Sequence, residues 1–192
     1  MNWLAHLYLS EPTPEFQIGN ILPDLLRPAE LRNLPTTFAP GVACHHAIDA
    51  FTDSDLIVNC SIKRLDQSHR RYGRIIMDMF YDHFLAAEWS AYSDVSLESF
   101  LRDAYRSFEF HRCDIPPSAF DVLQRMSHED WLGSYRDLNG VRNALNRIGA
   151  RLRKPVKLGG SITALESRRS EFHDDFVTFF PRLKAHVAAL RR

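Results

Sequence analysis

The stretch that decides the fold class is GVACHHAIDAFTD, residues 41–53. When each residue advances by about 100°, as in an α-helix, the polar side chains of His45, His46, Asp49 and Asp53 fall within about a quarter-turn. The apolar side chains between them point the other way. The stretch therefore predicts an amphipathic helix, with one face that packs and one face that displays imidazoles and carboxylates.

The same helical periodicity recurs along most of the chain, whereas alternating β-branched runs between turn signals are missing. We expect further helices over residues 2–9, 14–26, 55–67, 72–89, 96–111, 117–131 and 138–152. Thr163, which has capping-box spacing to Glu166, should start a last helix that runs towards Arg191. Pro23 should break or kink the helix over 14–26, and Pro181 should bend or interrupt the last helix. The prediction is an all-α, multi-helix bundle of roughly eight to ten helices.

Length and composition narrow the class of protein. The chain has 192 residues, 45% of them hydrophobic, and its 24 basic and 24 acidic residues give no net charge. These values fit a single domain over residues 1–192 and exclude disorder and general polyanion binding, so we expect no nucleic-acid partner. The chain has three cysteines without zinc-type spacing, and it shows neither an apolar run of ~18 residues nor a basic leader. These features predict a cytoplasmic location without a membrane span. No pattern indicates an oligomeric state.

A second polar set lies on the helix expected over residues 72–89. Asp78, Asp82 and His83 fall on the same arc as the apolar side chains of that helix, which places two acids and a histidine on its core face. A buried carboxylate is costly unless it is paired or binds a cation. We therefore interpret this arc as metal-binding.

With His6 and Asp24, the two helices supply a set of histidines and aspartates in the first half of the chain. Helical folds build divalent-metal sites from such ligands on facing helices, and mixed nitrogen and oxygen donors suit manganese, iron, zinc or magnesium. The structural alternatives are a core histidine for His6 and a helix-end carboxylate for Asp24. No phosphate-binding loop, nucleophile elbow or Cys-x-x-Cys competes with this set. Its members are His6, Asp24, His45, His46, Asp49, Asp53, Asp78, Asp82 and His83.

Two basic stretches accompany the polar set. Residues 138–165 contain no acidic residue, which is typical of a solvated face or of a docking surface for an anionic partner. The arginines between residues 64 and 74 either hold a phosphate or neutralise nearby aspartates. The first stretch carries Arg142, Arg147, Arg151, Arg153, Lys154 and Lys157, and the second carries Arg64, Arg70, Arg71 and Arg74.

Several segments resemble the acyl carrier protein phosphodiesterase family, which belongs to the HD-type metal phosphohydrolases. The resemblance spans nearly the whole chain, and the order and spacing of its segments are more specific than any single motif. The segments are MNWLAHL at 1–7, GNILPD at 19–24, residues 41–53, DMFYDHFL at 78–85 with Trp89, and, more loosely, WLGSYR at 131–136 and FFPR at 179–182.

The resemblance implies an HD-domain-like fold and the removal of 4′-phosphopantetheine from holo-acyl carrier protein, with Mn²⁺ or Mg²⁺ as cofactor. Because acyl carrier proteins are acidic helical bundles, they suit a basic docking surface, for which the expected residues are Arg147, Arg151, Arg153 and Lys154. Two alternatives stay open: an HD-type phosphohydrolase acting on nucleotides or other small phosphate esters, and a non-catalytic helical module that binds an acidic protein.

Our hypothesis is a metal-assisted hydrolysis of a phosphodiester, in which these polar residues have the following roles. The metal ligands are expected to be Asp24, His45, Asp82 and His83. Asp49 completes the ligand set or orients the attacking water, and His6 is a further ligand or the acid for the departing serine oxygen. Support for the ligands is expected from Asn20, Asp53 and Asp78, and phosphate binding from Arg70 and Arg71.

Overall fold

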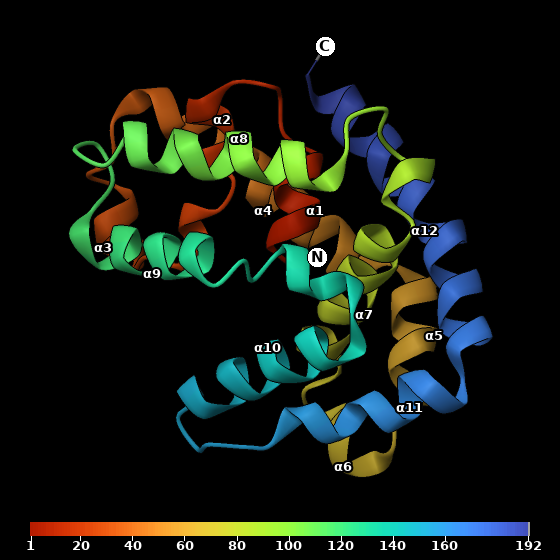
Figure 1. The fold of residues 1–192 in the computed structure, drawn as a ribbon. Helices are drawn as coiled ribbons and strands as arrows, with labels where there is room; N and C mark the ends of the chain where they lie inside the picture. Colours follow the sequence, from red (N-terminus) through yellow and green to blue (C-terminus); the bar gives the residue numbers. More distant parts are fainter. Residues whose placement is uncertain (192) are drawn as a thin grey trace.

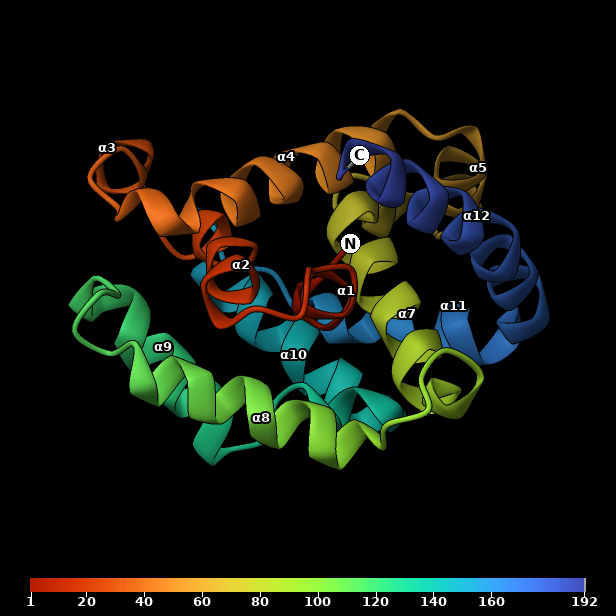
Figure 2. The ribbon, with the colours of Figure 1, turned by 90° about the horizontal axis from the view of Figure 1, so that it is seen from above.

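Helix α7 (Gly73–Ala87) lies at the centre of the computed structural model, which describes residues 1–191 (Figure 1). Most of its residues from Ile76 to Ala86 are buried. Seen from above, α1 (Trp3–Tyr8) and α10 (Leu138–Arg151) lie on one side of α7, and α5 (Leu56–Arg64) and α12 (Arg169–Leu190) lie on the other (Figure 2). The polar residues of α7 are therefore enclosed by helices from both halves of the chain.

The described residues form helices and no strand, which confirms the prediction of an all-α, multi-helix bundle. Buried apolar side chains make one cluster that extends from Met1 to Val187. The remaining α-helices are α2 (Pro14–Gly19), α3 (Pro28–Leu31), α4 (Ala39–Ser54), α6 (Gln67–Arg70), α8 (Leu97–Phe110), α9 (Pro117–His128) and α11 (Ile162–Ser167). Short 3₁₀ turns are η1 (Leu22–Asp24), η2 (Thr36–Phe38), η3 (Trp89–Ala91), η4 (Gly133–Arg136) and η5 (Leu158–Ser161).

One of the two proline predictions is confirmed and the other is wrong. The helix expected over residues 14–26 is interrupted: it ends at Gly19, and Pro23 lies in the following 3₁₀ turn. The last helix starts at Ile162, so the predicted Thr163 cap is wrong, and it is broken at Arg168 and not at Pro181. Pro181 lies on the exposed side of α12, where the carbonyl that loses its hydrogen bond can reach water, so the helix continues through it.

Close contact between α2 and α4 depends on two glycines. A Cβ added to Gly41 would lie 2.2 Å from the carbonyl oxygen of Phe16, and one added to Gly19 would lie 2.3 Å from that of Phe38. Only glycine allows backbones to approach this closely. As a result Asn20, which directly follows α2, contacts His45, which lies one turn after Gly41 on α4.

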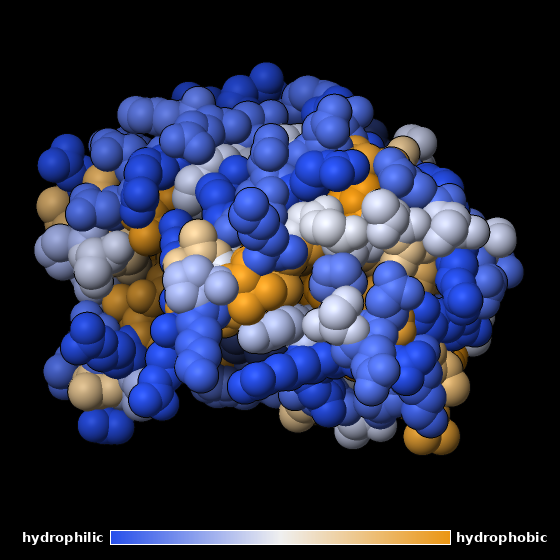
Figure 3. Space-filling model, turned by 90° about the horizontal axis from the view of Figure 1, so that it is seen from below, coloured by the Kyte–Doolittle hydropathy of each residue, from blue (hydrophilic) through white to orange (hydrophobic). Residues whose placement is uncertain are grey.

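No described helix is both long and apolar enough to cross a membrane. The face seen from below in Figure 3 is mostly hydrophilic, and its apolar side chains show mainly in the hollows between polar ones. Concave places with apolar walls are the usual form of ligand sites.

Candidate active site

Three residues from two helices converge on one point. His6 on α1 and His45 on α4 stack with ring centroids 4.3 Å apart. The Nε2 atom of each points at the carboxylate of Asp49, at 3.3 Å for His6 and 3.0 Å for His45. His6 and His45 are buried, whereas the Asp49 side chain is 41% exposed. The carboxylate therefore connects a buried imidazole pair to the surface.

Asn20, directly after α2, fixes both imidazoles. Its side-chain oxygen accepts a hydrogen bond from His6 Nδ1 at 3.0 Å, and its backbone oxygen accepts one from His45 Nδ1 at 2.8 Å. Asn20 Nδ2 donates to the backbone oxygen of His6 and to Ser10 Oγ, so its side-chain oxygen is the acceptor. Because carbonyl oxygens only accept, both Nδ1 atoms carry the proton. Both Nε2 atoms face Asp49, and that of His6 also lies 3.1 Å from the backbone oxygen of Met1.

The hydrogen bonds and charges within the cluster favour the charged forms of Asp49 and His45. Burial alone would raise the pKa of Asp49, but hydrogen bonds from His45 and His6 hold that pKa well below its usual range. Burial also opposes a charge on His45, yet its hydrogen bond to Asp49 and the charges of Asp24 and Asp49 raise the pKa of His45. The carboxylate of Asp49 is thus held in the ionised form that metal binding needs.

The cluster fits a divalent cation. His6, His45 and Asp49 each offer a ligand atom within 4.8 Å of the others. Two imidazoles and a carboxylate are the mixed donor set of manganese, iron and zinc sites. An imidazole that binds a metal through one nitrogen usually donates its other N–H to a carbonyl or carboxylate, which is the part Asn20 takes here for both rings.

Asp24 and Trp3 extend the cluster towards solvent. Asp24, in the 3₁₀ turn η1, is 39% exposed and its Oδ1 lies 3.6 Å from His45 Nε2. Trp3 Nε1 donates to the other Asp24 oxygen at 2.9 Å. The predicted residues His6, Asn20, Asp24, His45 and Asp49 are therefore brought together by the fold.

A cavity of about 430 Å³ opens beside this cluster. Its wall holds Asp78, whose Oδ1 lies 2.9 Å from the amino nitrogen of Met1. It also holds two arginines, Arg74, which is paired with Asp53, and Arg151. The full lining is Met1, Asn2, Trp3, Asp24, Asp49, Asp53, Arg74, Ile75, Asp78, Met79, Ile148, Arg151 and Leu152.

Asp82 lies apart from the cluster, and its buried carboxylate is already used. Its oxygens accept hydrogen bonds from the backbone N–H groups of Asn2 at 3.3 Å, Leu4 at 2.8 Å and Ala5 at 3.3 Å. These are the free amides at the start of α1, which has no side-chain cap of its own. Burial raises the pKa of Asp82 to about 7. We replace its predicted ligand role with that of a cap for α1.

His83 also has both ring nitrogens engaged elsewhere. Its Nδ1 donates to the backbone oxygen of Tyr135 at 2.8 Å, and its Nε2 accepts from Arg169 at 2.9 Å. Burial lowers the pKa of His83, so the neutral ring accepts the arginine proton. Because its acceptor nitrogen is taken by a cation, we withdraw its predicted role as a metal ligand.

Of the predicted phosphate-binding residues Arg70 and Arg71 and the predicted docking residues, only Arg151 lines the cavity. Arg70 donates to the backbone oxygen of Leu65, and Arg71 lies over the Tyr72 ring, so neither lines the cavity. Arg151, expected on the docking surface, lines the cavity instead. Of the other expected docking residues, Arg147 lies 4.2 Å above the Trp131 ring, and Arg153 and Lys154 are exposed just after α10.

Trp3 is a site residue to which the sequence analysis gave no site role, whereas Arg74 was one of the arginines expected to hold a phosphate or neutralise nearby aspartates, and it pairs with Asp53 at the cavity. Helical spacing links both of them to residues of the site. Trp3 lies three residues before His6 on α1, and Arg74 lies four residues before Asp78 on α7, and such pairs share a helix face.

The site residues lie within the part of the chain that matches a known family. A family model described as acyl carrier protein phosphodiesterase matches residues 1–183. The chain belongs to the acyl carrier protein phosphodiesterase family. It is accordingly an enzyme, a hydrolase of phosphodiester bonds.

Individual members of the acyl carrier protein phosphodiesterase family support this placement. The acyl carrier protein phosphodiesterases of Salmonella agona and Salmonella dublin are each 30% identical to this chain over 189 residues, which is 98% of this chain and 98% of theirs. That of Salmonella newport matches to the same extent. No solved structure matches the chain, so the HD-domain-like part of the predicted fold stays a prediction.

Proposed function

We propose that this enzyme hydrolyses the phosphodiester that joins 4′-phosphopantetheine to a serine of holo-acyl carrier protein. The observation that carries the proposal is the His6–His45–Asp49 cluster, whose Asp49 lines a cavity that also bears Arg74 and Arg151. Such a site presents metal-type ligands and guanidinium groups to one anionic substrate. Relatives matched over 98% of their length are named acyl carrier protein phosphodiesterase.

We further propose that His6, His45 and Asp49 hold Mn²⁺ or Mg²⁺. When bound, such an ion neutralises phosphate charge and lowers the pKa of a water molecule. Asp24, which Trp3 holds at the solvent side of His45, is placed to orient the attacking water. This assignment keeps His45 from the sequence-based ligand set, replaces Asp82 and His83, and moves Asp24 from the ligands to the orientation of the water.

The reaction balances as a simple hydrolysis. The oxygen of water bonds to phosphorus, the bond between phosphorus and the serine oxygen breaks, and a proton from the water ends on the serine oxygen. The products are apo-acyl carrier protein and 4′-phosphopantetheine. Arg74 and Arg151 contribute by binding the phosphate oxygens at the cavity wall.

One experiment tests the reaction directly. The purified enzyme is incubated with holo-acyl carrier protein and Mn²⁺, and the carrier is weighed by mass spectrometry; we expect the mass of the apo-protein. Dialysis against a chelator should abolish the change and added Mn²⁺ should restore it. An unchanged carrier would contradict the substrate, and full activity after chelation would contradict the metal. Turnover of free nucleotides at a comparable rate would favour the small phosphate esters.

The docking surface has its own test. Arg153 and Lys154 are exposed and do not line the cavity, so the double variant Arg153→Glu, Lys154→Glu should raise KM for the carrier and leave kcat unchanged. Arg125→Glu, an exposed charge reversal on α9, is the matched control. An unchanged KM in the double variant would remove these residues from the docking surface.

A further inference from the structure

The active-site cavity has an apolar wall that the proposed chemistry does not use. Beside its charged residues, the lining includes apolar side chains from α1, α7 and α10 and from the residue after α10. All of them except Met79 are only partly buried where they pack against the core. Their remaining exposed surface is therefore available to a ligand in the cavity. These side chains are Trp3, Ile75, Met79, Ile148 and Leu152.

Trp3 connects the apolar wall to the reacting atoms. Its Nε1 donates to one Asp24 oxygen at 2.9 Å, and the other Asp24 oxygen lies 3.6 Å from His45 Nε2. The Trp3 ring stacks on the Trp131 ring, with centroids 6.3 Å apart and planes 12° apart. Contacts at its edge and on one face thus fix the orientation of the Trp3 ring before a ligand arrives. The apolar wall therefore begins beside the candidate metal cluster.

On α7 and α10, apolar and basic side chains of the cavity lie together. Arg151 and Leu152 follow Ile148 by three and four residues, so the three side chains share one helix face. On α7, Arg74 directly precedes Ile75. The two helices pack against each other. The cavity therefore offers guanidinium groups next to apolar side chains, which suits a phosphate that is followed closely by an apolar group.

The substrate of the proposed reaction has this order of groups. In 4′-phosphopantetheine, the ester CH₂ beside the phosphate is followed by a carbon that bears two methyl groups, which we call the dimethyl group. The hydroxyl, amide and thiol groups come only after it. On the other side of the phosphate, the serine belongs to the folded carrier, which is too large to enter a cavity of about 430 Å³. Only the prosthetic group can therefore bring an apolar group into the cavity next to the phosphate.

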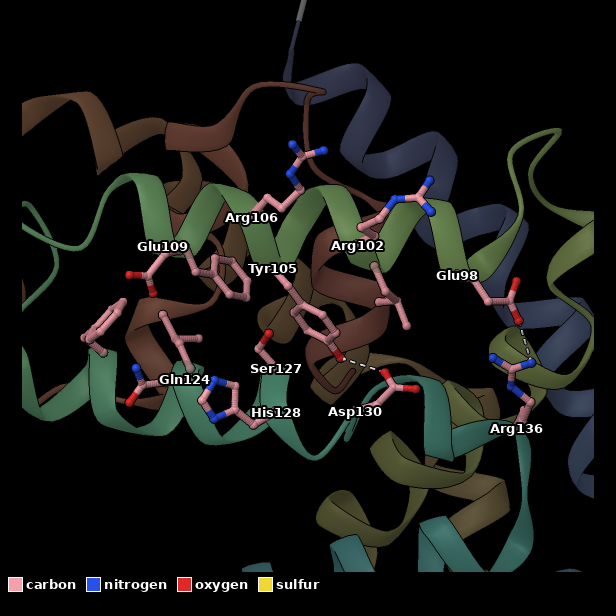
Figure 4. Close-up of a pocket in the computed structure, with 14 residues that line it drawn as sticks. Glu98, Arg102, Tyr105, Arg106, Glu109, Gln124, Ser127, His128, Asp130 and Arg136 are labelled. Carbon is pink, nitrogen blue, oxygen red and sulfur yellow. Dashed lines mark hydrogen bonds and ion pairs between the residues drawn. The ribbon is translucent and has the colours of Figure 1, made fainter.

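A second cavity, of about 660 Å³, lies between α8 and α9 and shares no lining residue with the active-site cavity. Polar groups of its lining are engaged with one another: Figure 4 shows the Glu98–Arg136 ion pair and the hydrogen bond from Tyr105 to Asp130. Its lining contains no residue of the metal cluster. The arm of a substrate that reacts at the cluster therefore belongs in the active-site cavity.

We propose that the apolar wall is the subsite for the dimethyl group of the 4′-phosphopantetheine arm. This role rests on the proposed function, and through it the enzyme recognises the prosthetic group as well as the carrier. Two methyl groups that leave water against Trp3, Ile75 and Ile148 contribute hydrophobic free energy, which does not depend on the charges around them. The cavity volume lies in the range of roughly 300–1,000 Å³ typical of small-ligand sites.

Saturation-transfer NMR on the free product tests this contact directly. Full-length enzyme is mixed with excess 4′-phosphopantetheine and Mg²⁺, which is diamagnetic, and the aromatic protons of the enzyme are saturated. We expect the methyl signals of the product to receive the largest saturation, because these groups contact the wall, and the CH₂ beside the thiol the smallest. In calorimetric titrations, the analogue in which CH₂ replaces the dimethyl carbon should bind about tenfold more weakly.

Variants of the wall locate the subsite. Ile148→Ala and Ile75→Ala shorten partly buried side chains of α10 and α7, so both proteins should fold. Each should raise the Kd of 4′-phosphopantetheine by about three- to tenfold and that of the analogue by about twofold or less, because the analogue lacks the methyl groups that make the contact. Leu138→Ala, the same loss of carbon atoms from a partly buried α10 residue outside the cavity, is the matched control and should change neither.

Largest saturation at the methyl groups together with weaker binding of the analogue supports the proposal. No measurable binding of the product, equal affinity for the analogue, or an unchanged Kd in both isoleucine variants would overturn it. Variants that raise KM for the holo-carrier but leave the Kd of the free product unchanged would also overturn it, and would assign the wall to the carrier.

Failure of the subsite is distinguishable from failure of the proposed function. If the enzyme converts holo-carrier to apo-carrier but the methyl groups of the product receive no saturation, only the subsite is overturned. If the mass of the carrier stays unchanged, the proposed function is overturned whatever the NMR spectra show.

Discussion

The His6–His45–Asp49 cluster and the Asp82–His83 pair consist of the same residue types, on helices that share one core. They differ in whether their polar atoms face one another or other parts of the core. Asn20 takes the Nδ1 protons of the first two histidines and leaves both Nε2 atoms facing Asp49. In the pair, backbone amides and Arg169 engage the acceptor atoms. We propose the first cluster as the site of chemistry because its three ligand atoms lie within 4.8 Å of one another, whereas other groups engage Asp82 and His83.

The two regions are nonetheless linked through α1. Asp82 accepts hydrogen bonds from the first amides of that helix, and His6 lies in its last turn. With six residues, α1 is too short to be stable alone. Asp82 therefore positions the helix that carries His6, which makes it a positioning residue whose effect on activity is indirect.

The largest effect is expected from Asp49→Asn. The amide lacks the charge that connects the two imidazoles, so we expect kcat/KM to fall by about 10²–10⁴. Circular dichroism should show an intact fold, because the Asp49 side chain is partly exposed. Bound Mn²⁺, measured by elemental analysis after dialysis, should be lost. Activity within a few-fold of the wild type would move the site away from the cluster.

Asn20→Ala should come next. It removes the acceptor for His6 Nδ1 and leaves the backbone acceptor for His45. Loss of such support for a ligand typically costs about 10–100-fold in metal affinity or activity. Titration of the metal-free protein with Mn²⁺ measures this cost. The conservative change Asn20→Asp keeps an acceptor and should retain more affinity than Asn20→Ala; the reverse order would contradict the role of Asn20.

Asp82→Asn should act mainly on stability. It leaves one acceptor for three α1 amides, so we expect the free energy of unfolding to fall by about 1–3 kcal/mol. Because the folded pKa is raised to about 7, the folded state holds the proton more tightly than the unfolded state, and the stability advantage of Asp82 is largest at acid pH. The gap between wild type and variant should narrow as pH rises from about 4 to about 7.

Urea unfolding of both proteins across this pH range measures that gap. A gap that widens with pH would mean that the α1 amides hold Asp82 ionised. The kcat of the folded variant should stay within about tenfold of the wild type, because Asp82 lies outside the His6–His45–Asp49 cluster. Complete loss of bound Mn²⁺ from a folded Asp82→Asn protein would return this residue to the ligand set.

His83→Gln should have the smallest effect. Glutamine can still donate to the backbone oxygen of Tyr135 and accept from Arg169, which are the two contacts of the ring. We expect a change in unfolding free energy of about 1 kcal/mol or less and an unchanged affinity for Mn²⁺. A clear loss of metal affinity would erase the distinction between the two regions.

Local pattern was sufficient for much of this picture. The spacing of His45 and Asp49 on α4 placed both on one face, because i and i+4 are neighbours on any helix. The burial of Asp82 and His83 followed from their apolar arc on α7. The break in the last helix did not follow from Pro181, because the cost of a proline depends on whether the freed carbonyl can reach water.

The roles of individual polar atoms depended on contacts distant in sequence. Asp82 meets amides 77–80 residues away, and no local rule predicts such a partner. Arg151 lines the cavity and Arg70 does not, because helix packing, and not charge density along the chain, decides which side chains meet.

By itself, the sequence determined an all-helical chain, the family, and a set of His and Asp residues on helix faces, since period and residue type are local properties. Only the tertiary structure decided which of those residues converge on one point. The GVACHHAIDAFTD helix supplies two of them, His45 and Asp49. Asn20 reaches it where Gly19 and Gly41 let α2 and α4 touch, and His6 comes from α1. Hydrogen-bond partners are set by packing, and packing joins residues far apart in the chain.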